Sequence, residues 1–230
     1  MQQYASPPKL PRSVLEGGDP TTSVYAFPPN RETLGGTAYF LAQHNILIDA
    51  PAWNEENLQF LDNRGGVKQW VMTHRGGFGK QVAKMAQQLG CVLVVQEQEA
   101  YLLPEVDCQT FHHNKTLALG CEVIWTPGHS PGSACVYYAG HGGMLFTGRH
   151  LLGDRAGNPA PLRIAKTFHW PRQLRSVQCL RDRFSVETLS WICPGASIGM
   201  LRGKGAIDRA FVRLGAIDLA ALAPQAARLL

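Results

Sequence analysis

The sequence predicts a single α/β domain. Its 230 residues, 45% of them hydrophobic, can bury a full core, and α/β chains of this length are routinely one domain. Short runs rich in β-branched and aromatic residues alternate with segments whose apolar residues recur at helical spacing. Residues 1–22 are rich in Pro, Gly, Ser and Thr and predict an N-terminal tail, so the domain is expected to comprise residues 23–230.

The predicted elements alternate along this domain. The first three strands are split only by turn clusters, which favours consecutive antiparallel pairing. Strands are predicted at 24–27, 37–42, 45–49, 70–72, 92–95, 117–119, 121–125, 135–138 and 144–146. Helices are predicted at 55–61, 81–90 and 171–184 and within 206–230, a brief helical turn at 101–103, and a loop at 153–167.

The stretch from Trp70 to Lys80 organises the prediction of a functional site. A short apolar run ends in Thr-His and opens onto a glycine-rich turn, after which a helix is predicted. Loops at the C-terminal ends of strands are where α/β folds place their sites. We therefore expect functional side chains in and around this turn.

Four motifs, this one included, resemble those of the metallo-β-lactamase superfamily. The Thr-His end of the strand is similar to the start of the family signature THxHxDH, and residues 126–133 match the family segment TPGHSPGS residue for residue. Residues 145–149 resemble the segment LFTGD, and residues 193–196 resemble PGHG. The resemblance covers roughly residues 23–200 and implies a four-layer αββα sandwich of two mixed β-sheets, with the site at one edge.

The same motifs depart from the family at most metal ligands. His74 and His129 stand at ligand positions, and Asp49, in a segment similar to LIDTG, is implied as a supporting residue or else caps a turn. The remaining ligand positions hold residues that do not coordinate metals: Gly76, Phe78, Gly79, Arg149 and Ala196. A guanidinium about 4 Å from a dication would be repelled by several kcal/mol even at an effective dielectric near 20.

No metal cofactor is therefore expected. The alternative is one weakly bound Zn or Fe ion on His74 and His129, with His150 swinging in as a third ligand.

The glycine-rich turn also predicts an anion site. Glycines at the start of a helix expose backbone N–H groups where the helix dipole favours negative charge. The candidate residues are His74, Arg75, Gly76, Gly77, Gly79, Lys80, His129, Arg149 and His150. Two alternatives stay open: the glycines fill space left by lost ligands, and Arg149 points into solvent or pairs with an acid such as Asp154.

Three functional hypotheses follow. The first is a pseudoenzyme without the dinuclear metal site that binds a small anionic molecule or a protein partner. The second is a weak mononuclear metal-dependent hydrolase that uses His74 and His129, and the third is a metal-independent enzyme. Metal content separates the first two hypotheses.

Composition limits the compartment and the partners. Six cysteines with no CxxC pair, and no signal-like opening segment, favour a cytoplasmic protein with reduced thiols. No apolar run approaches the ~20 residues of a membrane span. The net charge of +5 permits a nucleic-acid partner, but no run of five or more Lys or Arg supports one. The oligomeric state is not predicted.

Overall fold

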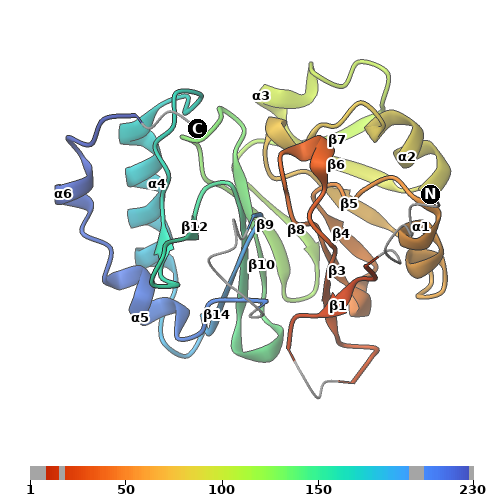
Figure 1. The fold of residues 1–230 in the computed structure, drawn as a ribbon, viewed down its shortest axis with the longest axis horizontal. Coiled ribbons are helices and arrows are strands. Elements are labelled where there is room, and N and C mark those ends of the chain that lie inside the picture. Colours follow the sequence, from red (N-terminus) through yellow and green to blue (C-terminus); the bar gives the residue numbers. More distant parts are fainter. Residues whose placement is uncertain (1–8, 16–18, 197–204, 228–230) are drawn as a thin grey trace, which may run out of the picture.

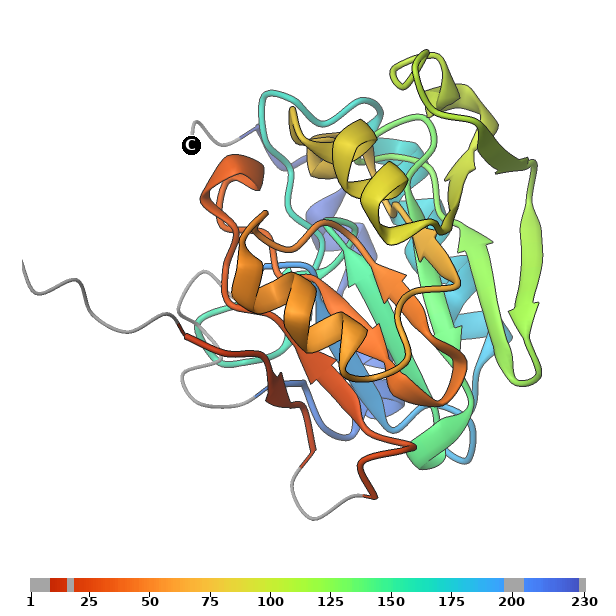
Figure 2. The same cartoon turned by 90° about the vertical axis from the view of Figure 1, so that its right-hand side faces the viewer.

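Two β-sheets pack face to face with helices on both outer faces (Figures 1 and 2). The structure is a computed structural model, and it describes residues 9–15, 19–196 and 205–227. Helices α1, α2 and α3 lie on the side of the first sheet, and α4, α5 and α6 lie on the side of the second (Figure 1). The predicted αββα sandwich of two mixed sheets is confirmed.

The first sheet has seven strands in the order of the chain. Its strands are β1 (Arg12–Ser13), β2 (Val24–Ala26), β3 (Tyr39–Leu41), β4 (Ile46–Ile48), β5 (Gln69–Val71), β6 (Val92–Gln96) and β7 (Cys108–Phe111). Neighbours from β1 to β4 are antiparallel, and those from β4 to β7 are parallel. Strand β1 lies in the segment predicted as a tail, where Arg12 pairs with Ala26 and Val14 donates its N–H to Val24.

The second sheet has five strands in the order β14-β11-β10-β9-β8. Its strands are β8 (Asn114–Ala118), β9 (Cys121–Trp125), β10 (Ala134–Tyr138), β11 (Met144–Gly148) and β14 (Trp191–Pro194). All neighbours are antiparallel except β14, which runs parallel to β11. A separate short hairpin joins β12 (Leu152–Gly153) to β13 (Pro159–Ala160) within the predicted loop.

Capping residues explain where the helices begin and end. The α-helices are α1 (Glu55–Asp62), α2 (Val82–Leu89), α3 (Glu97–Ala100), α4 (Trp170–Arg183), α5 (Ala210–Gly215) and α6 (Leu219–Leu222). Asn54 caps α1 by accepting from the Asn57 N–H, and Gly90 ends α2 in the left-handed conformation. The helical turn predicted at 101–103 begins earlier, because the Gln96 side chain caps α3.

Successive side chains of each strand point to opposite faces of its sheet, and together they form three apolar layers. In β5, Trp70 packs toward α1 and α2, whereas its neighbour Val71 packs between the sheets. On the other side, Leu145 of β11 packs with Val177 of α4, and Phe146 joins the layer between the sheets. Both sheets are therefore covered on both faces. None of the helices in the described ranges is both long and apolar enough to cross a bilayer.

Candidate functional site

The candidate site lies at one edge of the sandwich, where both sheets contribute strand ends. Asp49 follows β4 and His74 follows β5 in the first sheet; His129 lies in the loop between β9 and β10, and Arg149 and His150 follow β11 in the second. We call these five residues the mouth. Parallel strands bring their C-terminal ends to the same sheet edge, which explains why residues 25 positions apart in the chain converge.

A buried hydrogen-bond chain joins Asp49 to His74 through Thr73. The Thr73 N–H donates to Asp49 Oδ1 at 2.9 Å, and the Thr73 hydroxyl lies 2.8 Å from each carboxylate oxygen. The same hydroxyl lies 3.0 Å from His74 Nδ1. Because the hydroxyl donates to the carboxylate, it accepts from Nδ1–H, which assigns the lone pair of neutral His74 to Nε2.

Burial largely determines the protonation states of Asp49 and His74, the two ends of this hydrogen-bond chain. It raises the pKa of Asp49 to about 6, against the lowering effects of the Thr73 hydrogen bonds and the Arg149 charge. For His74, burial lowers the pKa well below its usual value, and His129 and Arg149 lower it further. His74 is therefore a neutral imidazole at pH 7, and Asp49 is mostly ionised.

His129 is held against His74 by the TPGHSPGS loop. The two rings meet edge to face with centroids 5.6 Å apart. The loop is tied internally by the Ser130 N–H donating to Ser133 Oγ at 2.8 Å, and it packs so tightly on α4 that a Cβ at Gly128 would lie 2.3 Å from the Gln173 backbone. Burial lowers the pKa of His129 to about 4, with smaller contributions from the Arg149 and Arg75 charges.

His150 lies behind His129 and is 1% exposed. Its N–H donates to the Thr147 carbonyl, and its carbonyl accepts from Gln173 Nε2 at 3.0 Å. Neither ring nitrogen has a hydrogen-bond partner among the described residues, and the same holds for His129 Nδ1 and Gln173 Oε1. Burial, followed by the interaction with His129, lowers the pKa of His150 to about 3.

Arg149 turns toward the loop between β2 and β3. Its Nη2 donates to the carbonyls of Thr33 at 2.7 Å and Leu34 at 3.1 Å. The alternative that Arg149 points into solvent or pairs with Asp154 is wrong, because its guanidinium is held by these two carbonyls and forms no ion pair with Asp154. The guanidinium is partly buried and interacts favourably with the Asp49 charge.

The glycine-rich turn differs from its prediction. Helix α2 begins only at Val82, and a 3-10 turn (Arg75–Gly77) precedes it. The N–H of Gly77 donates to the His74 carbonyl and that of Gly79 donates to the Gly77 carbonyl, so neither is available to an anion. The prediction that all three glycines expose free N–H groups is therefore wrong for Gly77 and Gly79.

The remaining members of the predicted anion site are divided. Gly76 lies beside His74, since a Cβ there would sit 3.3 Å from His74 Nε2, and its N–H donates to no other described residue. Arg75 is directed to Glu99, with Nε 4.0 Å from Oε1. Lys80 is exposed, and the described part of the chain gives it no hydrogen bond or ion pair. Gly76 therefore lies beside the mouth, whereas no contact among the described residues places Lys80 there.

The donor set does not fit the dinuclear metal site of the resembled family. Among residues 9–15, 19–196 and 205–227, no three His, Cys, Asp or Glu side chains are grouped to hold a metal ion. Two imidazoles remain, and Asp49 is engaged by Thr73. Arg149 also places a fixed cation within electrostatic reach of both rings.

Three buried polar residues of the site were missed by sequence reasoning. Thr73 was noted only as part of a motif, although it connects Asp49 with His74. Gln173 falls on the apolar face of α4 at helical spacing, which is a signal that could have found it. Glu99, 1% exposed and accepting from the Gly132 N–H, lies in a polar run that carries no such signal.

Comparison with known proteins supports the fold. Neither a scan against protein-family models nor a search of curated proteins found a match. Among solved structures, the chain is similar to the DIM-1 metallo-β-lactamase, with TM-score 0.62 and 15% identity over 94% of this chain and 100% of that chain. It is also similar to the metallo-β-lactamase family protein TTHA1429 from Thermus thermophilus, with TM-score 0.62 and 18% identity over 87% of this chain and 79% of that chain.

A quorum-quenching N-acyl homoserine lactone lactonase is a third similar structure, with TM-score 0.57 and 15% identity over 78% of this chain and 94% of that chain. The chain therefore adopts the fold of the metallo-β-lactamase superfamily. At these identities the likeness concerns the fold, and the chemistry has to be argued from the mouth itself.

Proposed function

We propose that this protein is a catalytically degenerate metallo-β-lactamase-fold protein that works without a metal and binds a small anion at the mouth. The observation that carries the proposal is the position of Arg149. Its positive charge lowers the pKa of both His74 and His129, so a permanent cation lies close to the two remaining ligand-type side chains. It takes over the electrostatic role that a metal ion has in the resembled family.

The site is better suited to an anion than to a metal cation. Catalytic zinc sites commonly have three protein ligands, and the mouth offers two imidazoles. Bringing a dication near the Arg149 guanidinium adds a repulsion of several kcal/mol at about 4 Å and an effective dielectric near 20. An anion with a single charge is instead attracted, by about half that magnitude.

The guanidinium also retains donors for a ligand. Arg149 has five N–H donors, and its described hydrogen bonds leave from Nη2 alone. A carboxylate or phosphate matches the planar fork of a guanidinium with two parallel hydrogen bonds. The Gly76 N–H beside His74 supplies a further donor. The ionised Asp49 offsets part of the positive charge, which favours a ligand with a single negative charge.

Calorimetric titration tests this proposal. Phosphate and small carboxylates are titrated into the wild type, Arg149→Ala and the control Arg155→Ala, which removes an exposed arginine between β12 and β13. Loss of a charge-assisted hydrogen bond should weaken binding about tenfold or more in Arg149→Ala and leave Arg155→Ala unchanged. Equal binding by all three proteins, or none by any, contradicts the proposal.

A mononuclear hydrolase is the second candidate, and His150 is the observation in its favour. Both ring nitrogens of this buried side chain lack partners among the described residues, and the ring interacts with His129. A shift of the His150 ring toward His74 and His129 would bring a third imidazole to them. Stoichiometric zinc that is lost in His150→Gln, together with lactone or ester hydrolysis, would support this candidate over the anion-binding one.

A metal-independent enzyme receives less support. The hydrogen bonds from Asp49 through Thr73 to His74 leave a lone pair on His74 Nε2, which is the arrangement of a general base. The strongly lowered pKa makes that imidazole a weak base at pH 7.

A further inference from the structure

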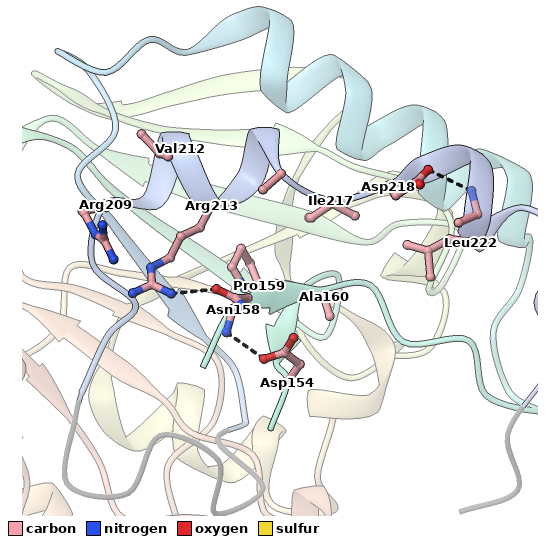
Figure 3. Close-up of a pocket in the computed structure, with 12 residues that line it drawn as sticks. Asp154, Asn158, Pro159, Ala160, Arg209, Val212, Arg213, Ile217, Asp218 and Leu222 are labelled. Carbon is pink, nitrogen blue, oxygen red and sulfur yellow. Dashed lines mark hydrogen bonds between the residues drawn. The ribbon is translucent and has the colours of Figure 1, made fainter. Parts of the chain in front are cut away.

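A groove separate from the mouth runs between the β12–β13 hairpin and helices α5 and α6 (Figure 3). Its volume is about 460 Å³, within the range of roughly 300–1,000 Å³ typical of small-molecule sites. We call it the C-terminal groove. Its lining comes from the hairpin and from both helices and includes Asp154, Pro159, Arg209, Arg213, Asp218 and Leu222.

One end of the C-terminal groove is cationic. Arg213 Nη1 donates to Asn158 Oδ1 at 2.6 Å and its Nη2 donates to Asp208 Oδ1 at 3.0 Å, so Asp208 offsets the Arg213 charge. The Nε of Arg213 is buried and has no partner among the described residues. Arg209 is exposed, and within residues 9–15, 19–196 and 205–227 it forms no ion pair. Its positive charge is therefore available to a ligand.

The Arg209 backbone adds a second observation. Its φ of 45° lies in the left-handed region, which a residue with a Cβ adopts at an energetic cost. Backbone strain of this kind collects at ligand-binding positions. The Arg209 side chain lies on the same side of α5 as that of Arg213 (Figure 3).

Carboxylates lie on the other walls of the groove. Asp218 Oδ1 caps α6 by accepting from the Ala221 N–H at 2.9 Å, and Asp154 Oδ1 accepts from two N–H groups of its own turn. The second oxygen of each carboxylate has no partner among the described residues. Figure 3 shows Asp218 at the opposite end of the groove from Arg209. The groove is thus bipolar, with a cation at one end and carboxylates along the rest.

Apolar groups cover the surface between these charges. Pro159 and Ala160 of β13 face Ile217 and Leu222 across the groove (Figure 3). Val212 is 57% exposed at the same surface. Opposite charges at the two ends, with apolar side chains between them, are complementary to a molecule that carries both charges and an apolar body.

We propose that the C-terminal groove binds a short apolar peptide through its two charged ends. The peptide carboxylate pairs with Arg209, the ammonium pairs with Asp218, and the apolar side chains contact Ile217 and Leu222. Arg209 precedes α5 and Asp218 caps α6, so a helix of six residues, about 9 Å long at the helical rise, and two linking residues lie between them. An extended tripeptide spans about 10 Å, which is of the same order.

Chemically blocked peptides test both ends. The tripeptide Leu-Ala-Leu is titrated in three forms, with free ends, with an acetylated N-terminus and with an amidated C-terminus, by calorimetry or by NMR shift perturbation. The free peptide should bind, and each block should weaken binding about tenfold because it removes one charge-assisted contact. Absence of binding by the free peptide, or equal binding by all three forms, overturns the proposal.

Variants assign each end of the peptide to its residue. Arg209→Ala should abolish the difference between the free and the amidated peptide, and Asp218→Asn, which retains a good helix cap, should abolish the difference between the free and the acetylated peptide. Arg155→Ala is the control on the neighbouring turn and should change neither. Arg149→Ala should leave peptide binding unchanged, which separates this groove from the anion site at the mouth. A peptide whose binding depends on Arg149 would refute the assignment to the groove.

Discussion

The ring of His74 meets the ring of His129 edge to face, with centroids 5.6 Å apart and an interplanar angle of 70°. The two rings come from different sheets; His74 is buried and His129 is partly buried, and the Arg149 charge acts on both. Protonation of one ring disfavours protonation of the other, because the two positive charges would lie within one low-dielectric site. The two rings therefore titrate as a coupled pair.

The metal content of the purified protein is the first prediction. Protein prepared without chelator should carry less than about 0.2 equivalents of zinc, iron or manganese, because two imidazoles beside a fixed cation are too few ligands. Elemental analysis by mass spectrometry measures this directly. Near-stoichiometric metal that disappears in His74→Ala would refute the metal-free proposal.

The second prediction concerns Thr73. Thr73→Val keeps the shape of the side chain but removes its hydrogen bonds to Asp49 and His74, leaving buried polar atoms unpaired. We expect a loss of about 1–3 kcal/mol in the free energy of unfolding. The matched control Thr116→Val alters an exposed threonine of β8 and should change stability by about 0.5 kcal/mol or less. Urea unfolding of both variants measures the difference. Equal losses of unfolding free energy would show that the hydrogen-bond chain from Asp49 through Thr73 to His74 contributes no stability.

The third prediction is a dependence of stability on pH. The folded-state pKa of His129 is about 4 and that of His150 is about 3, below the ordinary value of 6.5, so the unfolded state binds more protons between these values. Their contribution to stability is fully present above pH 6.5 and is lost as the pH falls toward 3. Asp49, whose pKa is raised from 3.8 to about 6, acts in the opposite direction, because its contribution declines as the pH rises through 6.

Unfolding free energies at pH 4, 5, 6 and 7 check this balance. His150→Gln should flatten the slope between pH 4 and 6.5, whereas Asp49→Asn should steepen it. An unchanged slope in His150→Gln would contradict the buried, neutral state of that ring.

The substitution of His74 or His129 by Asn or Gln should itself cost no more than about 0.5–3 kcal/mol in the free energy of unfolding, as ordinary core changes do.

The fourth prediction tests the contact between the TPGHSPGS loop and α4. Gly128 has a φ of 145°, and a Cβ there would lie 2.3 Å from the Gln173 backbone. Gly128→Ala should therefore destabilise the protein by about 3 kcal/mol or more. Gly157→Ala is the control, since its φ is 78° but a Cβ meets no atom within 4 Å, and it should cost only about 1–2 kcal/mol. Similar melting temperatures for the two variants would show that the loop can move away from α4.

Much of the fold could be predicted from the sequence because buried strands are apolar runs. The predicted strands at 45–49, 70–72 and 92–95 all appear, each with side chains packed on both faces. Strand β7 was missed because its residues are mainly polar and it lies at a sheet edge. Strand β1 has two residues within a segment of turn-forming composition, which leaves no periodicity to detect.

The candidate site could be predicted only where a motif carried it. His74 and His129 were found from their motifs, but the partners of Arg149 are backbone carbonyls more than 100 residues earlier, which no side-chain pattern reports. The availability of the glycine N–H groups also depends on local turn geometry: the Gly77 N–H is used by the 3-10 turn, and the Gly79 N–H donates to the Gly77 carbonyl just after it. At this site, the pattern of side chains in the sequence does not indicate which backbone groups are hydrogen-bonded.

The order of the strands in the two sheets determines at which stage of folding the mouth is assembled. Strands β1 to β7 all belong to the first sheet and β8 to β11 and β14 to the second, so the chain passes between the sheets once, at residues 111–114. Each sheet can pair through contacts within its own continuous half, which favours early formation of the halves during folding. Asp49 and His74 belong to one half, and His129, Arg149 and His150 to the other. The mouth therefore comes into existence only when the halves dock, and any ligand held there selects the docked state over every partly folded one.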